Sequence, residues 1–281
     1  MLVLAGIGLF NLRDIPLGLL SEVSDASAVF VETYTSIIPS FSLDKLSRLL
    51  NRQIIQLTRS DIENRGAKII LERARNEKVV LLVVGNPLLS TTHASLVIEA
   101  LKLGIAVKVI PAASVIDGIV VSTGLHVYKF GKIVTLVFPE DEELKSYPYT
   151  PYETLKDNLS RGLHTIFLLD IRQEEQRYLT APQAALLLLR IEEKFKENVL
   201  NEDTLAIAVA RATAEDEQIF VGKLSDLKNK DLGGPPHSLI IPGHLHYSEI
   251  EFLYYRTGTS MEVLKDWNRR LNARKMQRDT S

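Results

Sequence analysis

Short apolar runs alternate with longer amphipathic segments along the first 110 residues. The runs are rich in β-branched side chains and apolar on both faces, whereas the longer segments carry apolar residues at helical spacing. The predicted strands are residues 2–7, 28–32, 79–84 and 106–110, and the predicted helices are residues 15–23, 43–50, 61–75 and 93–103. Strands that are apolar on both faces and separated by helices are typical of a mostly parallel sheet that helices cover on both sides.

The pattern changes in the second half of the chain. The predicted strands there are residues 133–138, 165–171, 204–210, 218–221 and 238–241, with only two long helices, at residues 152–161 and 181–196. Thr180 and Gln183 form a capping-box pair at the start of the second helix, as Ser60 and Glu63 do for the helix at 61–75. The close spacing of the strands after residue 200 favours hairpins, so we expect a mixed sheet in this half.

These two patterns predict an α/β protein with two domains. At roughly 150 residues per domain, a chain of 281 residues corresponds to about two. We expect the boundary near residues 111–114, where a strand ends at a proline and small residues follow. The predicted domains are therefore residues 1–112 and 113–257.

The last segment, residues 258–281, is predicted to be a helical, basic tail that is partly disordered. Leu264, Trp267 and Leu271 have helical spacing, and residues 265–281 hold six basic and two acidic side chains. One interpretation is a solvated helix that frays at its end. The other is a contact with RNA or protein.

Composition limits the class of protein. The chain is 46% hydrophobic and 24% charged, the usual balance of a globular protein, which excludes a mostly disordered chain. Its 33 basic and 35 acidic residues give a net charge of −2, so no strong positive field would attract nucleic acid. The apolar runs are far shorter than the roughly 18 residues that span a bilayer, and the amino terminus resembles a strand more than a signal peptide. We therefore expect a cytoplasmic protein without membrane or nucleic-acid partners.

Several kinds of catalytic centre have no support in the sequence. The chain has no cysteine, which excludes disulfides, thiolate metal sites and a cysteine nucleophile. His244 and His246 are placed on the same face of a strand, but no third ligand is evident, so no metal is expected. The sequence has no Gly-x-Ser-x-Gly elbow, no P-loop and no paired-carboxylate motif, and no catalytic residue is predicted.

Two glycine-containing turns follow predicted strands. Gly6 and Gly8 come after the first strand, but Asn11 stands where a dinucleotide fingerprint needs its third glycine. Gly85 and Asn86 follow the strand at 79–84. Ligands bind outside the carboxyl ends of strands in open α/β sheets, and small residues let them approach the backbone. Each turn is therefore either a ligand contact or simple turn geometry.

Three polar features also allow two interpretations each. Residues 90–93 open a helix, either as a cap in which Thr91 or Thr92 accepts an amide, or as the lip of a ligand site. His126, in a loop, and His237, after a glycine-proline segment, are either structural or catalytic. Residues 140–152 form either a solvated loop or a substrate-protein contact made by exposed Tyr147 and Tyr149.

The motifs of the chain together are similar to those of one known family. In the first half they are Gly6-Ile7-Gly8-Leu9, Arg13-Asp14-Ile15, Glu32-Thr33-Tyr34-Thr35-Ser36, Gly85-Asn86-Pro87, Thr91-Thr92-His93 and Ala113-Ser114-Val115. In the second half they are Thr123-Gly124-Leu125-His126, Tyr128-Lys129-Phe130-Gly131, Gly162-Leu163-His164-Thr165, Leu169-Asp170-Ile171, Ala210-Arg211-Ala212 and Pro236-His237-Ser238. Over residues 1–255 the chain resembles the diphthine synthases, which belong to the tetrapyrrole-methylase-like class of S-adenosylmethionine-dependent methyltransferases.

The resemblance implies two α/β/α domains with the methyl donor in the cleft between them, and a homodimer. The family's donor contacts carry over to eight positions, namely Leu9, Asn86, Leu89, Ser114, Val115, Leu169, Ala210 and His237. Asn86 departs from the family pattern, which usually has aspartate there. Asparagine keeps an acceptor oxygen but loses the negative charge. Donor affinity would therefore fall only if that charge pairs with the cationic part of the donor.

The resemblance also implies an activity. The enzyme would methylate the amino group of the 3-amino-3-carboxypropyl-modified histidine of translation elongation factor 2, giving diphthine in diphthamide biosynthesis, with S-adenosylhomocysteine as the second product. Because a sulfonium methyl is already activated, the protein mainly has to orient it against the amine. The alternatives are a same-fold methylase for a tetrapyrrole or ribosomal RNA, and a non-catalytic module that binds S-adenosylmethionine.

Overall fold

The computed structural model describes residues 1–34, 36–38, 41–58, 67–141 and 143–279, with the backbone alone from residue 274. The chain divides into two compact units. Unit 1 comprises Met1–Gly118 and Arg172–Gln176, and unit 2 comprises Ile119–Ile171 and Arg177–Ser281. The domain limits expected from the sequence, residues 112 and 257, stay a prediction.

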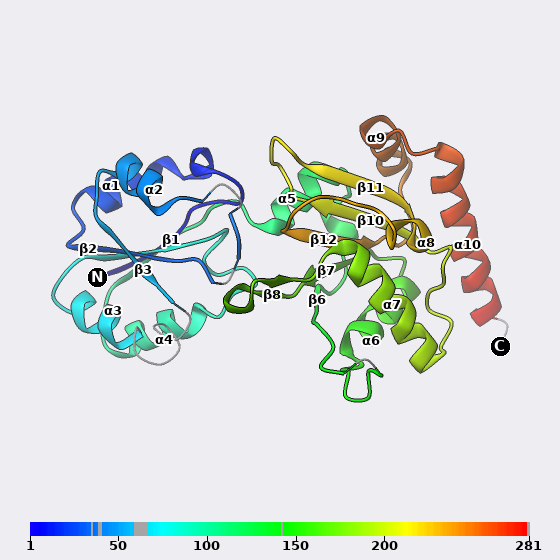
Figure 1. The fold of residues 1–281 in the computed structure, drawn as a ribbon, viewed down its shortest axis with the longest axis horizontal. Coiled ribbons are helices and arrows are strands. Elements are labelled where there is room, and N and C mark those ends of the chain that lie inside the picture. The colour runs from blue at the N-terminus through cyan, green and yellow to red at the C-terminus, as the bar shows by residue number, and fades with distance from the viewer. Residues whose placement is uncertain (35, 39–40, 59–66, 142, 280–281) are drawn as a thin grey trace. The chain divides into compact units, whose positions relative to one another are not determined.

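Unit 1 is built on a five-stranded parallel sheet (Figure 1). Its strands are β1 (Leu2–Gly6), β2 (Ala28–Glu32), β3 (Ile54–Leu57), β4 (Val79–Val83) and β5 (Val107–Ile110), in the order β3-β2-β4-β1-β5. The parallel sheet confirms the first predicted pattern. The strand β3 was not predicted from the sequence, because Ile55 and Gln56 are exposed on this edge strand and leave only two buried positions.

Helices cover both faces of this sheet. Figure 1 shows α1 (Leu17–Ser24) and α2 (Leu43–Leu50) on one face, and α3 (Ala67–Ala74) and α4 (Ala94–Lys102) on the other. Alternate residues of each strand separate into two cores: Val3, Ala5, Val80 and Leu82 pack with α1 and α2, whereas Leu2, Leu4, Val79 and Leu81 pack with α3 and α4. Each fully buried valine or leucine among them stabilises the fold by about 1.5–3 kcal/mol. The predicted capping pair Ser60 and Glu63 lies outside the described residues.

Unit 2 is built on a mixed five-stranded sheet. Its strands are β6 (Val134–Leu136), β7 (Thr165–Leu169), β10 (Leu205–Ala210), β11 (Gln218–Lys223) and β12 (His237–Ile241), in the order β11-β10-β12-β7-β6. Only β6 and β7 pair in parallel, and the other neighbours are antiparallel. The hairpin between β10 and β11 confirms the mixed sheet that the close strand spacing predicted.

The remaining elements are helices and short connections. The helices are α5 (Val115–Thr123), α6 (Thr150–Ser160), α7 (Ala181–Phe195), α8 (Leu224–Leu227), α9 (Tyr247–Thr257) and α10 (Met261–Asp279). A two-stranded ribbon is formed by β8 (Ile171–Arg172) and β9 (Arg177–Tyr178). The predicted capping box at the start of α7 is present, since Thr180 accepts from the backbone of Gln183 and Gln183 accepts from the backbone of Thr180.

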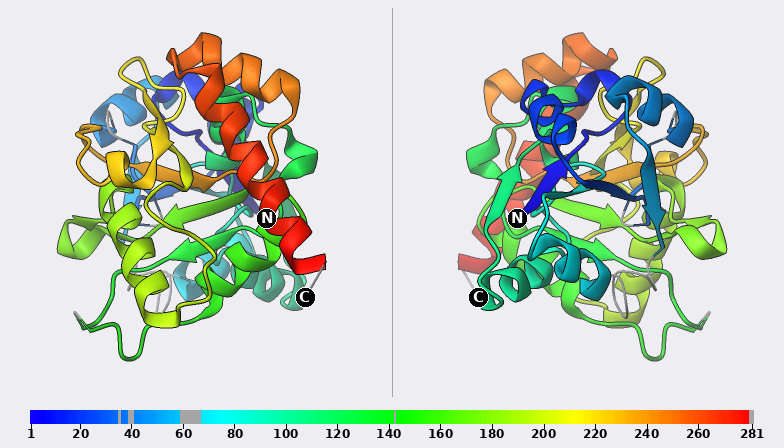
Figure 2. Two further views of the ribbon diagram at one scale, coloured as in Figure 1. Left: turned by 90° about the vertical axis from the view of Figure 1, so that its right-hand side faces the viewer. Right: turned by 90° about the vertical axis from the view of Figure 1, so that its left-hand side faces the viewer.

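Helix α10 is packed along its first turns. Figure 2 shows it in red as one continuous helix on the outside of unit 2. Leu264 and Trp267 are buried, and the indole N–H of Trp267 donates to the carbonyls of Pro242 (3.0 Å) and Gly243 (3.2 Å). The side chain of Asn268 bonds both the N–H and the C=O of Leu245. These contacts hold α10 against the turn that follows β12.

Two expectations from the sequence differ from the structure. Tyr147 is buried, with its hydroxyl on the Val137 carbonyl, and the Tyr149 hydroxyl donates to Glu197 (2.6 Å). Both rings pack into the core of unit 2, so they are not the exposed aromatics of a substrate contact. His244 and His246 lie in the turn after β12 and not on one face of a strand.

Among the described residues, no helix is both long and apolar enough to cross a membrane.

Candidate functional site

In unit 1, the loops after β1 and β4 are joined at the carboxyl edge of the sheet. The N–H of Ile7 donates to the Val83 carbonyl (2.9 Å), and the N–H of Gly85 donates to the Gly8 carbonyl (2.8 Å). The two segments therefore stay hydrogen-bonded to each other for two residues beyond the ends of β1 and β4. We call Gly6, Gly8 and Gly85, with the loops that they hold together, the glycine edge.

Steric limits explain the glycines of this edge. A Cβ on Gly6 would lie 2.3 Å from the Gly85 carbonyl oxygen and 2.8 Å from the Cβ of Ala112, which follows β5. Gly8 has a φ of +82°, and a Cβ there would lie 2.2 Å from the Cβ of Asp14. No larger residue fits either position without moving the backbone. The sequence alone left ligand contact and turn geometry equally open, and the structure adds that three loops meet here.

Asp14 fixes the first loop. Its carboxylate accepts the backbone N–H of Phe10 (2.8 Å) and of Asn11 (3.2 Å), while the Asn11 side chain accepts the N–H of Arg13 (2.7 Å). These bonds form a reciprocal capping box and hold Leu9 in a defined position. The spacing Asn11-x-x-Asp14 is the sequence signal that would have identified this role.

Asn86 connects the second loop to the third. Its Oδ1 accepts the N–H of Leu88 (3.1 Å), which is an Asx turn, and its Nδ2 donates to the Ala112 carbonyl (3.4 Å). Leu89 lies three residues on and is 38% exposed. Thr91 accepts the N–H of His93 (3.4 Å) in the loop before α4, but His93 is the N-cap of that helix and has no side-chain cap bond, so neither Thr91 nor Thr92 caps it as the sequence suggested.

Ser114 immediately precedes α5, at the end of the loop that follows β5. Its N–H and its hydroxyl both donate to the Asp117 carboxylate, at 2.6 Å and 2.7 Å, and Ser114 itself is buried. Val115 is the first residue of the helix. The spacing Ser114-x-x-Asp117 is again a capping pattern that can be read from the sequence. Unit 1 thus brings Leu9, Asn86, Leu89, Ser114 and Val115 to the carboxyl ends of three adjacent strands, β4, β1 and β5.

The three predicted donor contacts of unit 2 also share one edge of its sheet. Ala210, the last residue of β10, pairs with His237, the first residue of β12. Leu168 pairs with Ser238, so Leu169 at the end of β7 lies next to His237 at the same edge. Positions separated by 68 residues along the chain are therefore neighbours because the strands between them run antiparallel.

The imidazole of His237 is fully engaged inside unit 2. Its Nδ1 accepts the N–H of Ala181 at the start of α7 (3.1 Å), and its Nε2 donates to the carbonyls of Gly233 (3.1 Å) and Gly234 (3.0 Å). The partners assign the proton to Nε2. Burial lowers the pKa of His237 and keeps the ring neutral. Only the backbone of His237 is left to serve a ligand, which favours the structural interpretation of this side chain.

A buried carboxylate with four hydrogen-bond donors lies elsewhere in unit 2. Glu249 is completely buried and accepts from four donors: His164 Nε2 (3.1 Å), the N–H of His126 (2.8 Å), the N–H of His246 (2.6 Å) and Lys129 Nζ (2.9 Å). We call these five residues the Glu249 cluster. Burial alone would raise the pKa of Glu249, but the hydrogen bonds outweigh it and lower that pKa well below its usual range.

The Glu249 cluster lies at the opposite edge of the unit 2 sheet from Ala210 and His237. His164 precedes the first residue of β7, and its Nδ1 accepts the N–H of Gly243, two residues after β12 ends (2.9 Å). Residues 124–131 and 162–165, which carried much of the family resemblance, thus build this cluster. His126 is a member through its backbone, which agrees with the structural interpretation.

A second buried polar pair was not predicted. Glu32 ends β2 and His93 precedes α4, and both side chains are fully buried with His93 Nε2 3.7 Å from Glu32 Oε1. Burial lowers the pKa of His93 to about 4, so the ring is neutral near pH 7. Neither nitrogen of His93 has a hydrogen-bond partner among the described residues. The sequence could not identify this pair, because 60 residues separate its members.

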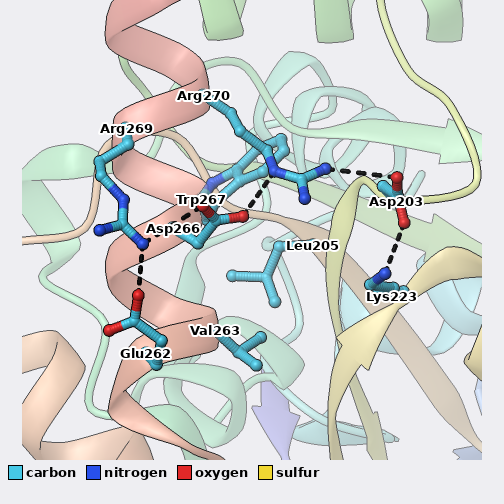
Figure 3. Close-up of a pocket in the computed structure, with 9 residues that line it drawn as sticks. All are labelled: Asp203, Leu205, Lys223, Glu262, Val263, Asp266, Trp267, Arg269 and Arg270. Atoms are coloured by element: carbon cyan, nitrogen blue, oxygen red, sulfur yellow. Dashed lines mark hydrogen bonds and ion pairs between the residues drawn. The ribbon is translucent and has the colours of Figure 1, made fainter.

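A surface pocket of unit 2 is also remote from the predicted contacts. It has a volume of about 260 Å³ and lies between α10 and the strands β10 and β11 (Figure 3). Leu205, Val263 and Trp267 line it together with six charged residues, and ion pairs join Arg270 to Asp203 and Asp266. Leu205 begins β10 and Ala210 ends it, so the two lie about 17 Å apart along the strand. Within the described parts of the chain, no three His, Asp or Glu side chains are arranged to hold a metal ion.

The chain is similar to methylases of known sequence. Residues 1–228 match the family model described as Tetrapyrrole (Corrin/Porphyrin) Methylases. A diphthine synthase from Methanocaldococcus jannaschii is 42% identical over 257 residues, covering 91% of this chain and 98% of the relative. A diphthine synthase from Methanococcus maripaludis is 41% identical over 255 residues with the same coverage.

Solved structures have the same fold. The TM-score is 0.83 with the crystal structure of a diphthine synthase, at 30% identity and covering 94% of this chain and 99% of that one. It is 0.81 with a conserved hypothetical protein from Aeropyrum pernix K1, at 27% identity and covering 96% and 97% of the two chains. These matches and the two observed sheets confirm the predicted fold class.

Proposed function

Because the chain belongs to the diphthine synthase family of the tetrapyrrole methylases, we propose that it methylates the 3-amino-3-carboxypropyl-modified histidine of translation elongation factor 2. The acceptor atom is the amino nitrogen of that side chain, the methyl donor is S-adenosylmethionine, and the product is diphthine. The family membership confirms the methyltransferase function that the sequence predicted. The observation that carries the proposal is the glycine edge, where three loops approach so closely that no side chain fits at Gly6.

The residues at this edge fit the donor in chemistry. In unit 1 we assign donor contacts to Leu9, Asn86, Leu89, Ser114 and Val115, and in unit 2 to Leu169, Ala210 and His237. Those of unit 1 offer an apolar surface, an amide, and backbone groups at the start of a helix. An apolar lining with a few placed polar groups is typical of a site for a small organic molecule. The backbone N–H and C=O groups at Ala210 and His237 would serve the donor, since the His237 ring is already bonded.

The chemistry requires orientation more than acid or base catalysis. The donor supplies a sulfonium methyl that is already activated for displacement by an amine lone pair. The rigid loops of the glycine edge would hold that group in one place, and such positioning can contribute several kcal/mol to the lowering of a barrier. A neighbouring sulfonium and exclusion of water would both favour the neutral, nucleophilic amine of the acceptor. The other six proposed contacts have no acidic or basic side chain, the Ser114 hydroxyl donates to Asp117, and both nitrogens of the His237 ring are already bonded. We therefore assign no general base.

A methyl-transfer assay tests the proposal. The full chain is incubated with radiolabelled S-adenosylmethionine and elongation factor 2 that carries the 3-amino-3-carboxypropyl group, beside unmodified factor, ribosomal RNA and a tetrapyrrole as controls. We expect label only on the modified factor. Label on the RNA or the tetrapyrrole would instead support a same-fold methylase. Donor binding without transfer to any acceptor would support a binding module.

The proposal also covers the oligomeric state of the protein and its compartment. We propose that the protein is a homodimer and acts in the cytoplasm. The charge balance of the chain favours a protein acceptor over nucleic acid. Sedimentation of the purified chain at micromolar concentration should give twice the mass of 31.5 kDa, and a monomer at that concentration would contradict the dimer.

A further inference from the structure

Two loops of unit 2 frame the edge that carries Ala210 and His237. The first, residues 211–217, follows β10, and the second, residues 228–236, precedes β12. The backbone of Arg211, in the first loop, is bonded to the second, because its N–H donates to the Pro236 carbonyl (2.8 Å). Its φ of +52° is in the left-handed region, which a residue with a side chain adopts at a cost of about 1 kcal/mol or more. Contacts of the surrounding loops must maintain that conformation.

The side chain of Arg211 supplies these contacts. Its Nε donates to the Asp216 carboxylate (2.7 Å) and one terminal nitrogen donates to the Asp216 carbonyl (2.8 Å), both in the first loop. The other terminal nitrogen donates to the carbonyls of Leu232 (2.9 Å) and Gly234 in the second loop. Four of the five guanidinium hydrogens are thus used, two on each loop. The side chain of Arg211 is 7% exposed, so the guanidinium is shielded from water, whereas the side chain of Asp216 is 63% exposed.

The same bonds reach His237. The Gly234 carbonyl accepts from both Arg211 and His237 Nε2, so one oxygen links the guanidinium to the imidazole. Gly233 leaves the space that this requires, because a Cβ there would lie 3.2 Å from both terminal nitrogens of Arg211. Residues on both sides of the Ala210–His237 pair are therefore tied to one cation.

We propose that Arg211 is a positioning residue for the methyl donor. By joining the two loops it fixes the backbone groups of Ala210 and His237, which the proposed function assigns to donor binding and on which this inference rests. The guanidinium itself has too few free hydrogens to bind the donor, so its effect is on the geometry of others. A fixed site binds more tightly than a mobile one because less conformational freedom is lost on binding.

Donor affinity and turnover separate this role from a catalytic one. We expect Arg211→Met to raise the dissociation constant of S-adenosylhomocysteine, measured by calorimetry, and the KM for S-adenosylmethionine by about 30-fold. At saturating donor, kcat should stay within about 3-fold of the wild type, because the acceptor and the methyl group are then correctly placed. Arg211→Lys should show a smaller loss of about 5-fold, since an ammonium cannot span both loops.

Two variants complete the experiment. Arg270→Met removes another arginine that forms ion pairs, with Asp266 and Asp203 near the other end of β10, and it should leave donor affinity within 2-fold. Asp216→Asn keeps the arginine but weakens its hydrogen bond to the first loop, and should raise the dissociation constant of S-adenosylhomocysteine by about 3-fold. If Arg211→Met does not fold, as judged by circular dichroism, the Arg211→Lys and Asp216→Asn variants decide the question.

The outcomes distinguish the two proposals. Weaker donor binding in the folded Arg211 and Asp216 variants with little change in kcat supports the positioning role. Unchanged donor affinity in those variants, or a loss of kcat alone, overturns it while the proposed function stands. Failure of the wild-type chain to bind S-adenosylhomocysteine overturns the proposed function, and the positioning role with it.

Discussion

The glycine edge of unit 1 and the Glu249 cluster of unit 2 are opposites in composition. The glycine edge is held by backbone hydrogen bonds and by the absence of side chains, and its predicted contacts are neutral. The Glu249 cluster gathers a buried carboxylate, two histidine backbones, an imidazole and an ammonium. A search for reactive groups would select the cluster. The family relationship and the sheet topology instead favour the edge, because methyl transfer from a sulfonium requires placement and no nucleophile of the protein.

The largest effect should come from Glu249→Gln. The substitution removes the charge on which four donors converge and should lower the free energy of unfolding by about 3–5 kcal/mol, because Lys129 and His164 lose their buried partner. Donor affinity of the folded variant should not change. Denaturant titration and calorimetry with S-adenosylhomocysteine measure the two quantities. Glu262→Gln, at an exposed ion pair, is the matched control and should leave both unaltered.

Gly6→Ala should affect donor affinity more than Glu249→Gln does, and stability less. Its Cβ would overlap the Gly85 carbonyl at 2.3 Å, so the loops after β1 and β4 must separate. We expect a loss of about 1–3 kcal/mol of stability and, because the donor surface moves, a fall in donor affinity of about 100-fold. Gly18→Ala in α1 is the control, since no atom lies within 4 Å of its Cβ. Equal donor affinity in Gly6→Ala and Gly18→Ala would remove the glycine edge from the binding site.

The pH dependence of stability should distinguish the wild type from Glu249→Gln. The pKa of Glu249 is lowered in the folded protein, whereas an unfolded glutamate titrates near 4.3. Below that value the unfolded state binds one more proton than the folded state. The stability that Glu249 contributes is therefore complete above about pH 5 and is lost by about 1.4 kcal/mol for each unit that the pH falls below 4. The free energies of unfolding of the wild type and Glu249→Gln, measured at pH 7, 4 and 3, should therefore approach each other as the pH falls. A difference that stays the same at all three pH values would show that Glu249 does not carry this charge.

The smallest effect is expected for Asn86→Asp. Aspartate keeps the acceptor for the Leu88 N–H and loses only the long bond of 3.4 Å to the Ala112 carbonyl. We expect donor affinity to change by less than about 3-fold, because the amide at this position acts mainly on the loop. Calorimetry at pH 7 measures the change. A gain of tenfold or more would mean that the family's aspartate interacts with the cationic part of the donor.

The sequence predicted the strands of unit 1 better than the contacts within the glycine edge. Continuous apolar runs identified β1, β2 and β4, because strands buried on both faces consist almost wholly of apolar residues. Such runs also predicted β5, although two of its four residues are exposed. They missed β3, whose two middle residues are exposed. The roles of Asp14 and Asp117 were also within reach, since both occupy capping positions at a fixed spacing from Asn11 and Ser114. What the sequence lacked was the pairing of Gly8 with Gly85, which depends on the order of the strands in the sheet.

In unit 2 the sequence alone could not separate structural from functional polar residues. His164 and Glu249 are 85 residues apart and meet only because α9 packs beside the start of β7. Tyr147 and Tyr149 were expected in an exposed loop because acidic residues and prolines surround them, yet both rings belong to the core. The resemblance to the diphthine synthases supplied eight positions that periodicity could not, and the structure brings five of them to one sheet edge in unit 1 and three to one edge in unit 2.

Hydrogen exchange with and without S-adenosylhomocysteine tests the central claim most directly. Amide protons of the full chain are compared at saturating ligand, peptide by peptide. The account predicts slower exchange in residues 7–10, 85–89 and 112–116 of unit 1 and in residues 168–170, 210–212 and 236–238 of unit 2. Residues 124–131, 162–165 and 243–249 around the Glu249 cluster should exchange at an unchanged rate. Protection confined to the cluster, with the glycine edge unaffected, would contradict it.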